Sequence, residues 1–120
     1  ISEHACTTFG HEQRDISTWS PPRKYDLVIC HGVLQYPSNT DVRKAMANLG
    51  KATQHFMYLE IPTKSDFEDV VDATVTDMNV HHRSGAWYRK ELAPHFIQVG
   101  AGLWQSRHSN IPMYELEACR

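Results

Sequence analysis

Three side chains that could move a proton follow the apolar runs of this sequence. His31 comes directly after the run Tyr25–Cys30, Tyr36 lies five positions further on, and Glu60 stands near the end of a second apolar run. A carboxylate that is partly buried at such an exit becomes a usable base. His31, Tyr36 and Glu60 are therefore the candidate catalytic residues. The alternatives are a structural role for His31 and an ordinary exposed carboxylate for Glu60.

A second group combines hydrogen-bonding and aromatic side chains, the types that contact a small organic substrate. Its members, the candidate substrate-binding residues, are Gln35, Tyr36, His81, His82, Arg83, Trp87 and Tyr88. A place in the core is the alternative for the two aromatic residues at the end of this group. The two adjacent histidines point to opposite sides of an extended segment and cannot easily share one ion, so no metal site is expected.

Composition excludes several classes of protein. The 120 residues are 41% hydrophobic with a net charge of -2, which is typical of one ordinary globular domain. A protein that binds nucleic acid usually carries a positive charge, so no nucleic-acid partner is expected. The three cysteines show no CxxC spacing, so we expect neither a disulfide framework nor a zinc ribbon, and a cytoplasmic location fits best. No apolar run approaches the ~18 residues of a membrane helix, so no membrane partner is expected.

The first half of the chain predicts a strand, a helix and a second strand. Tyr25–Cys30 and His55–Ile61 are short apolar runs typical of buried strands. Between them, apolar residues repeat at helical spacing, with Asn39 or Thr40 as the N-cap and Gly50 as the stop. A strand, a helix and a strand in this order form a βαβ unit with parallel strands. The fold class is therefore α/β.

The second half is less regular at first. Thr63–Arg83 resembles a lid or binding loop and contains a short acidic helix at Asp66–Asp72. A helix is expected over Ser84–Pro94. Two strands, Phe96–Trp104 and Pro112–Cys119, are then expected to form an antiparallel hairpin.

This order of elements resembles the second half of a class I S-adenosylmethionine-dependent methyltransferase, whose sheet order is 3-2-1-4-5-7-6 with strand 7 antiparallel. Arg14-Asp15-Ile16 is similar to the end of the family's strand 3, and the following Tyr25-Asp26-Leu27-Val28 to its strand 4. Val33-Leu34-Gln35-Tyr36 resembles the segment after strand 4, Tyr58-Leu-Glu-Ile-Pro62 resembles strand 5, and Ile1-Ser-Glu-His-Ala5 the stretch after strand 2. The resemblance implies a partial Rossmann-like sheet with strands 4-5-7-6, the last one antiparallel, and flanking helices.

The resemblance also implies a cofactor, S-adenosyl-L-methionine, and a small-molecule methyl acceptor. Asp15 would accept a hydrogen bond from the adenine amino group, and Ile16 would pack beside the ring. His31, Gly32 and Val33 would line the cofactor site beyond the end of strand 4. A solvated turn residue is the alternative for Asp15.

Two cofactor-binding features of the family have no counterpart here. The sequence has no glycine-rich loop after a first strand, and the ribose-binding acid would fall at or before Ile1. Gly100-Ala-Gly102 is no replacement, because no helix follows it, and these glycines are expected at packing or bulge positions. We expect residues 1–24 to be a loosely packed remnant and residues 25–120 to be the C-terminal half of the domain. The isolated chain would bind the cofactor weakly or not at all, and the exposed edge of strand 4 could mediate self-association.

Two other interpretations remain open. One is a non-enzymatic α/β binding or assembly module, and the other is a nucleotide-binding part of a different doubly wound enzyme. The terminal hairpin distinguishes a methyltransferase from other doubly wound nucleotide-binding enzymes, because most of those enzymes lack it. Pro112–Cys119 must lie antiparallel between its predecessor and the rest of the sheet, and any other position for it removes the basis of the methyltransferase assignment.

Overall fold

The computed structural model describes residues 3–69 and 79–118, and it shows a mixed α/β fold around one four-stranded sheet. The sheet order is β1-β2-β4-β3, with β1 parallel to β2, and β4 antiparallel to both of its neighbours. The strands are β1 (Tyr25–His31), β2 (Thr53–Glu60), β3 (Phe96–Gly100) and β4 (Leu103–Ser106). None of the helices in the described ranges is long and apolar enough to cross a membrane.

The parallel pair is joined by α2 (Asn39–Ala52), as the sequence predicts. Both predicted ends of this helix are wrong. Ser38 is the N-cap, since its side chain accepts a hydrogen bond from the Asp41 amide at 3.3 Å. Gly50 lies inside the helix, where a Cβ would come within 3.1 Å of the His95 Cβ. The glycine thus allows close packing and does not stop the helix.

The closing hairpin lies earlier in the chain than predicted. Phe96–Trp104 is not one strand, because Gly100, Ala101 and Gly102 all have positive φ angles and form the turn between β3 and β4. Pro112–Cys119 is not the inserted strand, since its described residues form turns and irregular structure. The slot between β2 and β3 is filled by β4 instead, in the predicted antiparallel direction. The pairing register of β3 with β4 shifts between Gln98 and Gly100, next to the first glycine.

Two shorter helices follow β2 in the chain. The first, α3 (Lys64–Asp69), confirms the start of the predicted acidic helix, and the rest of that helix lies outside the described residues. The second, α4 (Gly85–Leu92), begins at Ser84, whose side chain accepts a hydrogen bond from the Trp87 amide at 3.1 Å. The sequence therefore located this helix and its cap.

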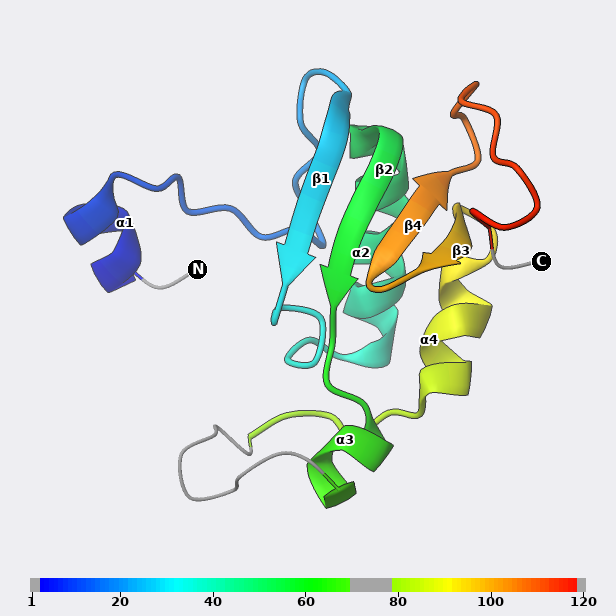
Figure 1. Ribbon diagram of the computed structural model, residues 1–120. Helices are drawn as coiled ribbons and strands as arrows, with labels where there is room; N and C mark the ends of the chain where they lie inside the picture. The colour runs from blue at the N-terminus through cyan, green and yellow to red at the C-terminus, as the bar shows by residue number, and fades with distance from the viewer. Residues whose placement is uncertain (1–2, 70–78, 119–120) are drawn as a thin grey trace.

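One face of the sheet is covered and the other is largely open. Both α2 and α4 lie behind the sheet in Figure 1, and their buried residues form one core with β1, β2 and β4. Successive strand residues point to opposite faces. On β1, Val28 and Cys30 face this core, whereas Leu27 is 53% exposed and Ile29 is 67% exposed. The βαβ unit therefore leaves an apolar face without a covering helix.

The chain before β1 differs from its prediction. Residues Glu3–Phe9 form α1, which projects away from the sheet in Figure 1 and contains no buried residue. Asp15 and Ile16 do not end a strand. They belong to a turn in which the amides of Thr18 and Trp19 both bond to the carbonyl oxygen of Asp15. Local turn hydrogen bonds thus stand where the resemblance implies the end of a strand.

Candidate functional site

Residues Gln13–Pro21, here called the strap, cross the helix-covered side of β1. The Asn48 side chain of α2 donates a hydrogen bond to the Ile16 carbonyl at 2.7 Å. Ile16 packs against the core, and Ser17 is buried. One tertiary hydrogen bond and one apolar anchor therefore hold the middle of the strap.

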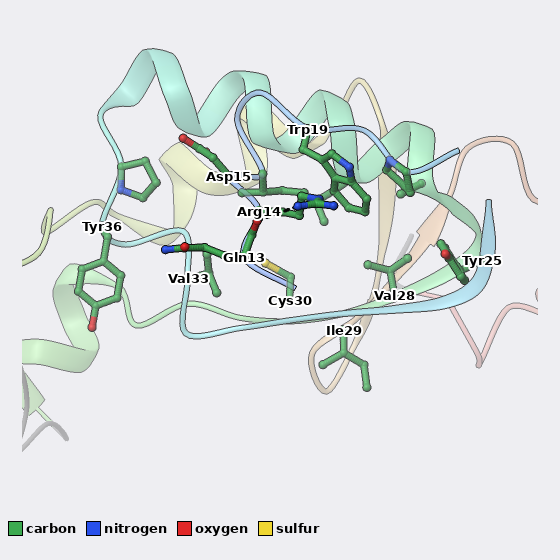
Figure 2. Close-up of a pocket in the computed structure, with 15 residues that line it drawn as sticks. Gln13, Arg14, Asp15, Trp19, Tyr25, Val28, Ile29, Cys30, Val33 and Tyr36 are labelled. Carbon is green, nitrogen blue, oxygen red and sulfur yellow. Dashed lines mark hydrogen bonds between the residues drawn. The ribbon is translucent and has the colours of Figure 1, made fainter. Parts of the chain in front are cut away.

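A cavity of about 970 Å³ lies between the strap, β1 and α2. In Figure 2, Trp19, Arg14 and Asp15 stand between α2 and the β1 ribbon, and Val28 points toward them. The side chains around the cavity are mostly apolar: Gln13, Arg14, Asp15, Ile16, Trp19, Pro21, Tyr25, Val28, Ile29, Cys30, Val33, Tyr36, Pro37, Leu49 and Ala52. A space of this size and lining suits a flat, mainly apolar ligand with a few polar atoms.

Asp15 is the acidic residue of this cavity. Its Oδ1 accepts hydrogen bonds from the Ser17 amide at 2.9 Å and from the Ser17 hydroxyl at 2.7 Å. These bonds favour the charged form and lower the pKa of the Asp15 carboxyl below its usual value. Among the described contacts, Oδ2 has no partner. Asp15 therefore presents one carboxylate oxygen that can accept a hydrogen bond from a ligand.

The apolar side of the cavity contains Cys30 and Trp19. Burial raises the pKa of the Cys30 thiol to about 11, because the thiolate would lose its hydration. This thiol is therefore a packing group and not a nucleophile near neutral pH. The guanidinium of Arg14 lies 6.0 Å from the centroid of the Trp19 ring. The Arg14 guanidinium therefore covers one side of the Trp19 ring.

A histidine and a glutamate side chain lie within hydrogen-bonding distance of each other where the two parallel strands end. His31 and Glu60 are register partners, and His31 Nε2 lies 3.0 Å from Glu60 Oε2. Gly32 turns the chain directly after β1 with φ +64, and its amide donates to the Glu60 carbonyl at 2.9 Å. A side chain on any other residue would be strained at this turn. The Glu60 side chain is 53% exposed, so the partial burial expected for it is not observed.

The cavity and the pair open on opposite sides of β1. His31 follows Cys30 directly, so their side chains point to opposite faces of the sheet. The connection after β1 joins the two sides, because Val33 lines the cavity and Gly32 contacts Glu60. Ligands of doubly wound sheets bind beyond the carboxyl ends of the strands, and this is the edge where both features occur.

The arrangement combines a carboxylate-oriented imidazole with an adjacent cavity for a planar ligand. Such a pair can act as a general base. No protein-family model, curated protein or solved structure matches this chain. The function must therefore be argued from the chain's own residues.

Of the five predicted cofactor residues, Asp15, Ile16 and Val33 line the cavity, whereas His31 and Gly32 do not. Tyr36, predicted as catalytic and substrate-binding, also lines the cavity and has no described hydrogen bond to the His31–Glu60 pair. Gln35 is buried. Its Nε2 donates to the Gly32 carbonyl at 3.0 Å, and its Oε1 has no partner among the described atoms.

Arg83 is buried, at 7% exposure, and its guanidinium is bound inside the chain. It donates to the Leu34 carbonyl at 3.0 Å, to Asn39 Oδ1 at 2.7 Å, and to the Pro37 carbonyl. All three acceptors belong to the connection from β1 into α2. Arg83 therefore fixes the segment between β1 and α2, which contributes Val33 and Tyr36 to the cavity.

The remaining substrate-binding candidates lie beside Arg83. Tyr88 is buried in the core, with its hydroxyl 3.2 Å from Arg83 Nη1, and Trp87 is partly buried against that core. The His82 ring stacks on Phe67 with 4.5 Å between centroids, and the His81 amide donates to the Gln35 carbonyl at 2.9 Å. The structure does not bring these residues to the His31–Glu60 pair.

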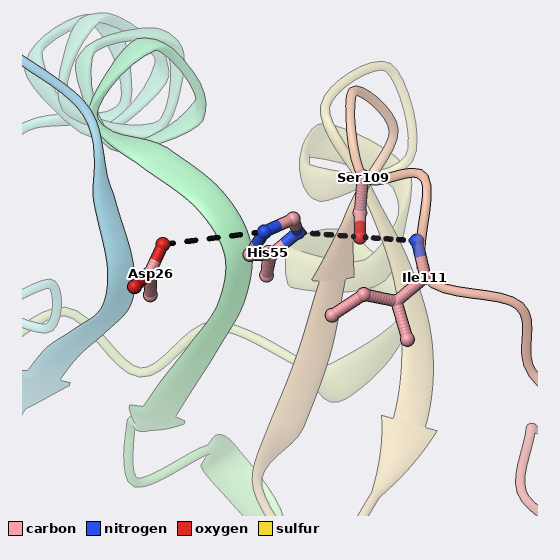
Figure 3. A network of polar contacts seen from close by, with 4 residues as sticks. All are labelled: Asp26, His55, Ser109 and Ile111. Carbon is pink, nitrogen blue, oxygen red and sulfur yellow. Dashed lines mark hydrogen bonds and ion pairs between the residues drawn. The ribbon is translucent and has the colours of Figure 1, made fainter.

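A second histidine, His55 on β2, also has a carboxylate and a hydroxyl nearby (Figure 3). His55 Nδ1 lies 2.9 Å from Ser109 Oγ, and its Nε2 lies 4.0 Å from Asp26 Oδ1. The Asp26 side chain is 92% exposed, and 4.0 Å is too long for a hydrogen bond. Ser109 Oγ also accepts a bond from the Ile111 amide at 3.2 Å. This network attaches the chain after β4 to the sheet and lacks the close contacts of a catalytic triad.

Sequence reasoning missed Trp19, Cys30 and Asn48 as parts of the site. An aromatic residue isolated in a polar segment is a signal that could have identified Trp19. Asn48 lies on a helix whose apolar face was recognised, but its bond to Ile16 joins residues 32 positions apart. No local pattern predicts such a contact.

Proposed function

We propose that this chain is part of an S-adenosylmethionine-dependent methyltransferase acting on a small-molecule acceptor. The observation that carries the proposal is the His31–Glu60 pair at the carboxyl ends of two parallel strands, beside a cavity lined by Asp15, Ile16 and Val33. The cofactor supplies a methyl group on a positively charged sulfur. The protein then has to align the acceptor, exclude water and accept a proton.

The strand order supports the proposal, although a different segment from the predicted one forms the inserted antiparallel strand. The assignment depended on Pro112–Cys119 as the inserted antiparallel strand, and that requirement fails for those residues. The same position is occupied by β4 with the same direction, so the order β1-β2-β4-β3 matches the order 4-5-7-6 that the resemblance implies. The match of these four strands to the family's strands is part of the proposal. The site geometry carries the functional argument.

Each residue has a stated role. The free Oδ2 of Asp15 accepts a hydrogen bond from the adenine amino group, and Ile16 and Val33 pack against the ring. His31 is the general base, and Glu60 fixes the orientation of its imidazole. The side chains in these roles are held in place by the strap and by the ends of β1 and β2, so no rearrangement of the chain is required.

The residues present fit the adenosyl half of the cofactor. The cavity is large enough for a purine ring, and its acid and apolar walls match the edge and faces of that ring. The sequence has no Gly-x-Gly-x-Gly loop to hold the methionine half. We therefore expect a weak dissociation constant, on the order of 1 mM, which corresponds to about 4 kcal/mol of binding free energy.

Calorimetric titration with S-adenosylhomocysteine tests the assignment. In Asp15→Asn, Oδ1 can still accept the two bonds from Ser17, so the amide NH2 takes the place of Oδ2 and faces the adenine amino group, donor against donor. We expect at least tenfold weaker binding, or about 1.4 kcal/mol. Asp26→Asn removes an exposed carboxylate outside the cavity and is the matched control. Equal binding by both variants and the parent chain would contradict the proposed adenine contact.

A second candidate function is an assembly module. The observation that favours it is the exposed apolar row of Leu27 and Ile29 on β1, the outer strand of the sheet. Edge strands with apolar side chains are templates for pairing with another chain. Sedimentation analysis of Ile29→Lys against the parent chain distinguishes this function, because a module that pairs through β1 dissociates when the charge is introduced.

A further inference from the structure

Resting on the proposed methyl transfer, we propose that the acceptor is a phenol. Its ring lies on an apolar shelf formed by Ile29, Tyr58 and Leu103, and its hydroxyl meets His31. The shelf is on the open face of the sheet, and Ile29 also borders the cavity that we assign to adenine. Three observations carry this inference: the shape and polarity of the shelf, the free nitrogen of His31, and the match in acidity between a phenol and an imidazole.

The shelf crosses three neighbouring strands at the end next to His31. Ile29 of β1 pairs with Tyr58 of β2, and Tyr58 pairs with Leu103 of β4. Ile29 is 67% exposed, and Leu103 is also exposed. Gly102 packs so closely that a Cβ there would lie 2.8 Å from Tyr58 Cε2, which fixes the tyrosine ring. The result is a flat apolar surface that suits the face of an aromatic ring.

The polar end of the shelf is His31, and one nitrogen of its ring has no hydrogen-bond partner among the described residues. His31 and Glu60 are the next residues on the same face, two positions after Ile29 and Tyr58. Glu60 occupies Nε2 of His31 at 3.0 Å, so Nε2 carries the proton of the neutral ring. Nδ1 has no hydrogen-bond partner among the described residues and keeps its lone pair. A hydroxyl group on a ring that lies on the shelf is therefore within the range of a free acceptor nitrogen.

Acidity favours a phenol over an aliphatic alcohol or a carboxylate as the acceptor. A phenol such as the tyrosine side chain has a pKa of about 10, whereas the proton of an aliphatic alcohol is far harder to remove. An imidazole removes a proton efficiently only when the two acidities are not far apart. A carboxylate acceptor carries no proton at neutral pH and needs no base. His31 can therefore act as a base toward a phenol, whereas a carboxylate acceptor offers it no proton to remove.

The chemical step balances without a further reagent. The phenol O–H bond breaks, and its proton goes to Nδ1 of His31. The phenolate oxygen forms a bond to the methyl carbon of the sulfonium donor as the carbon–sulfur bond breaks. The electron pair of that bond stays on sulfur, which becomes a neutral thioether. The imidazolium is stabilised meanwhile by the carboxylate of Glu60.

The test uses 7-hydroxycoumarin, whose phenol and phenolate forms absorb at different wavelengths, with 7-methoxycoumarin as a ligand without the acidic proton. No methyl donor is present, so the result is independent of cofactor binding. A protonated imidazole next to the phenolate favours the charged form, so bound 7-hydroxycoumarin should ionise about one pH unit lower than the free ligand. The absorbance is measured against pH at saturating protein.

Three variants assign the effect. His31→Gln should abolish the shift and still bind 7-methoxycoumarin, and Glu60→Gln should reduce the shift by weakening the support for the imidazolium. Both residues are exposed, so neither change affects the core. His55→Gln is the matched control, since it alters a different histidine, on β2 and not on β1, that lies 4.0 Å from a carboxylate. It should leave the shift unchanged.

The proposal is overturned by any of four results. The coumarins fail to bind, the shift is absent on binding, or the shift persists in His31→Gln. Loss of coumarin binding with rising protein concentration would show that a second copy of the chain covers the shelf instead, and this also rejects the proposal. A positive result with no binding of S-adenosylhomocysteine would keep the phenol site and reject methyl transfer.

Discussion

Arg83→Met is expected to destabilise the fold strongly, although the sequence favours a substrate-binding role for this arginine. The guanidinium donates to the carbonyl groups of Leu34 and Pro37, to the Asn39 side chain and to the Tyr88 hydroxyl. Methionine fills much of the same volume and removes every donor. The loss is therefore one of hydrogen bonds and charge, with little change in packing.

The magnitude follows from how many acceptors remain buried. The bond to Leu34 is buried and the bond to Pro37 is partly buried, and a bond to a charged group contributes about 1.5–3 kcal/mol. Water can replace the part-buried bond to Asn39 in part, whereas the bond to the Tyr88 hydroxyl is buried as well. We expect a loss of about 3–5 kcal/mol, which is a large share of the 5–15 kcal/mol typical of a domain. Arg83→Lys should recover less than half of it, because one ammonium group cannot span these acceptors.

Urea unfolding followed by tryptophan fluorescence measures the effect. With a slope of about 1.5 kcal/mol per molar urea, the midpoint should fall by about 2 M or more. Arg89→Met is the matched control, because Arg89 is exposed and bonds to Gln98 at 3.2 Å. The control should lose less than about 1 kcal/mol. If Arg83→Met loses no more than Arg89→Met, then Arg83 does not hold the connection after β1 and our reasoning fails.

Three further predictions concern the strap, the hairpin turn and the buried thiol. Asn48→Ala removes the bond to the Ile16 carbonyl, so hydrogen exchange in the strap should accelerate while global stability falls by only about 1 kcal/mol. Gly102→Ala combines a φ of +82 with a Cβ 2.8 Å from the Tyr58 ring, and thermal unfolding should show a loss of about 2 kcal/mol. The raised pKa of Cys30, about 11, means that its neutral thiol favours the fold below pH 9, with this contribution lost as the pH rises toward 11. Peptide mapping after alkylation at pH 8 should therefore find Cys30 unmodified until the chain is unfolded.

Local patterns predicted most of the sheet and of the main helix. The two apolar runs became β1 and β2, but the burial predicted for both faces is not observed, because helices cover only one face and most of β1 is exposed. The hairpin was misplaced because Pro112–Cys119 alternates like a strand, and because the turn at Gly100-Ala-Gly102 was taken as part of one long strand. The positive φ angles that define this turn belong to the folded backbone. A sequence shows which residues allow such angles but not which ones use them.

The candidate site was predictable in its positions but not in its contacts. His31 and Glu60 could be placed at strand exits from the ends of the apolar runs. Their pairing depends on a register that shifts between Tyr25 and Leu27, and no local pattern reveals such a shift. Arg83 was assigned to a binding loop for its charge, whereas its acceptors lie 44 to 49 positions earlier in the chain. Long-range contacts of this kind decide which polar residues are available to a ligand.

The central claim is that the space between the strap and β1 holds the adenosyl group of a methyl donor. Amide chemical shifts of the nitrogen-15-labelled chain, recorded during titration with millimolar S-adenosylhomocysteine, test it most directly. The account predicts concentration-dependent shifts centred on Ile16, Val33 and Tyr36, and their loss in Asp15→Asn. Shifts centred on β3 and α4, or a spectrum that does not change, would contradict it.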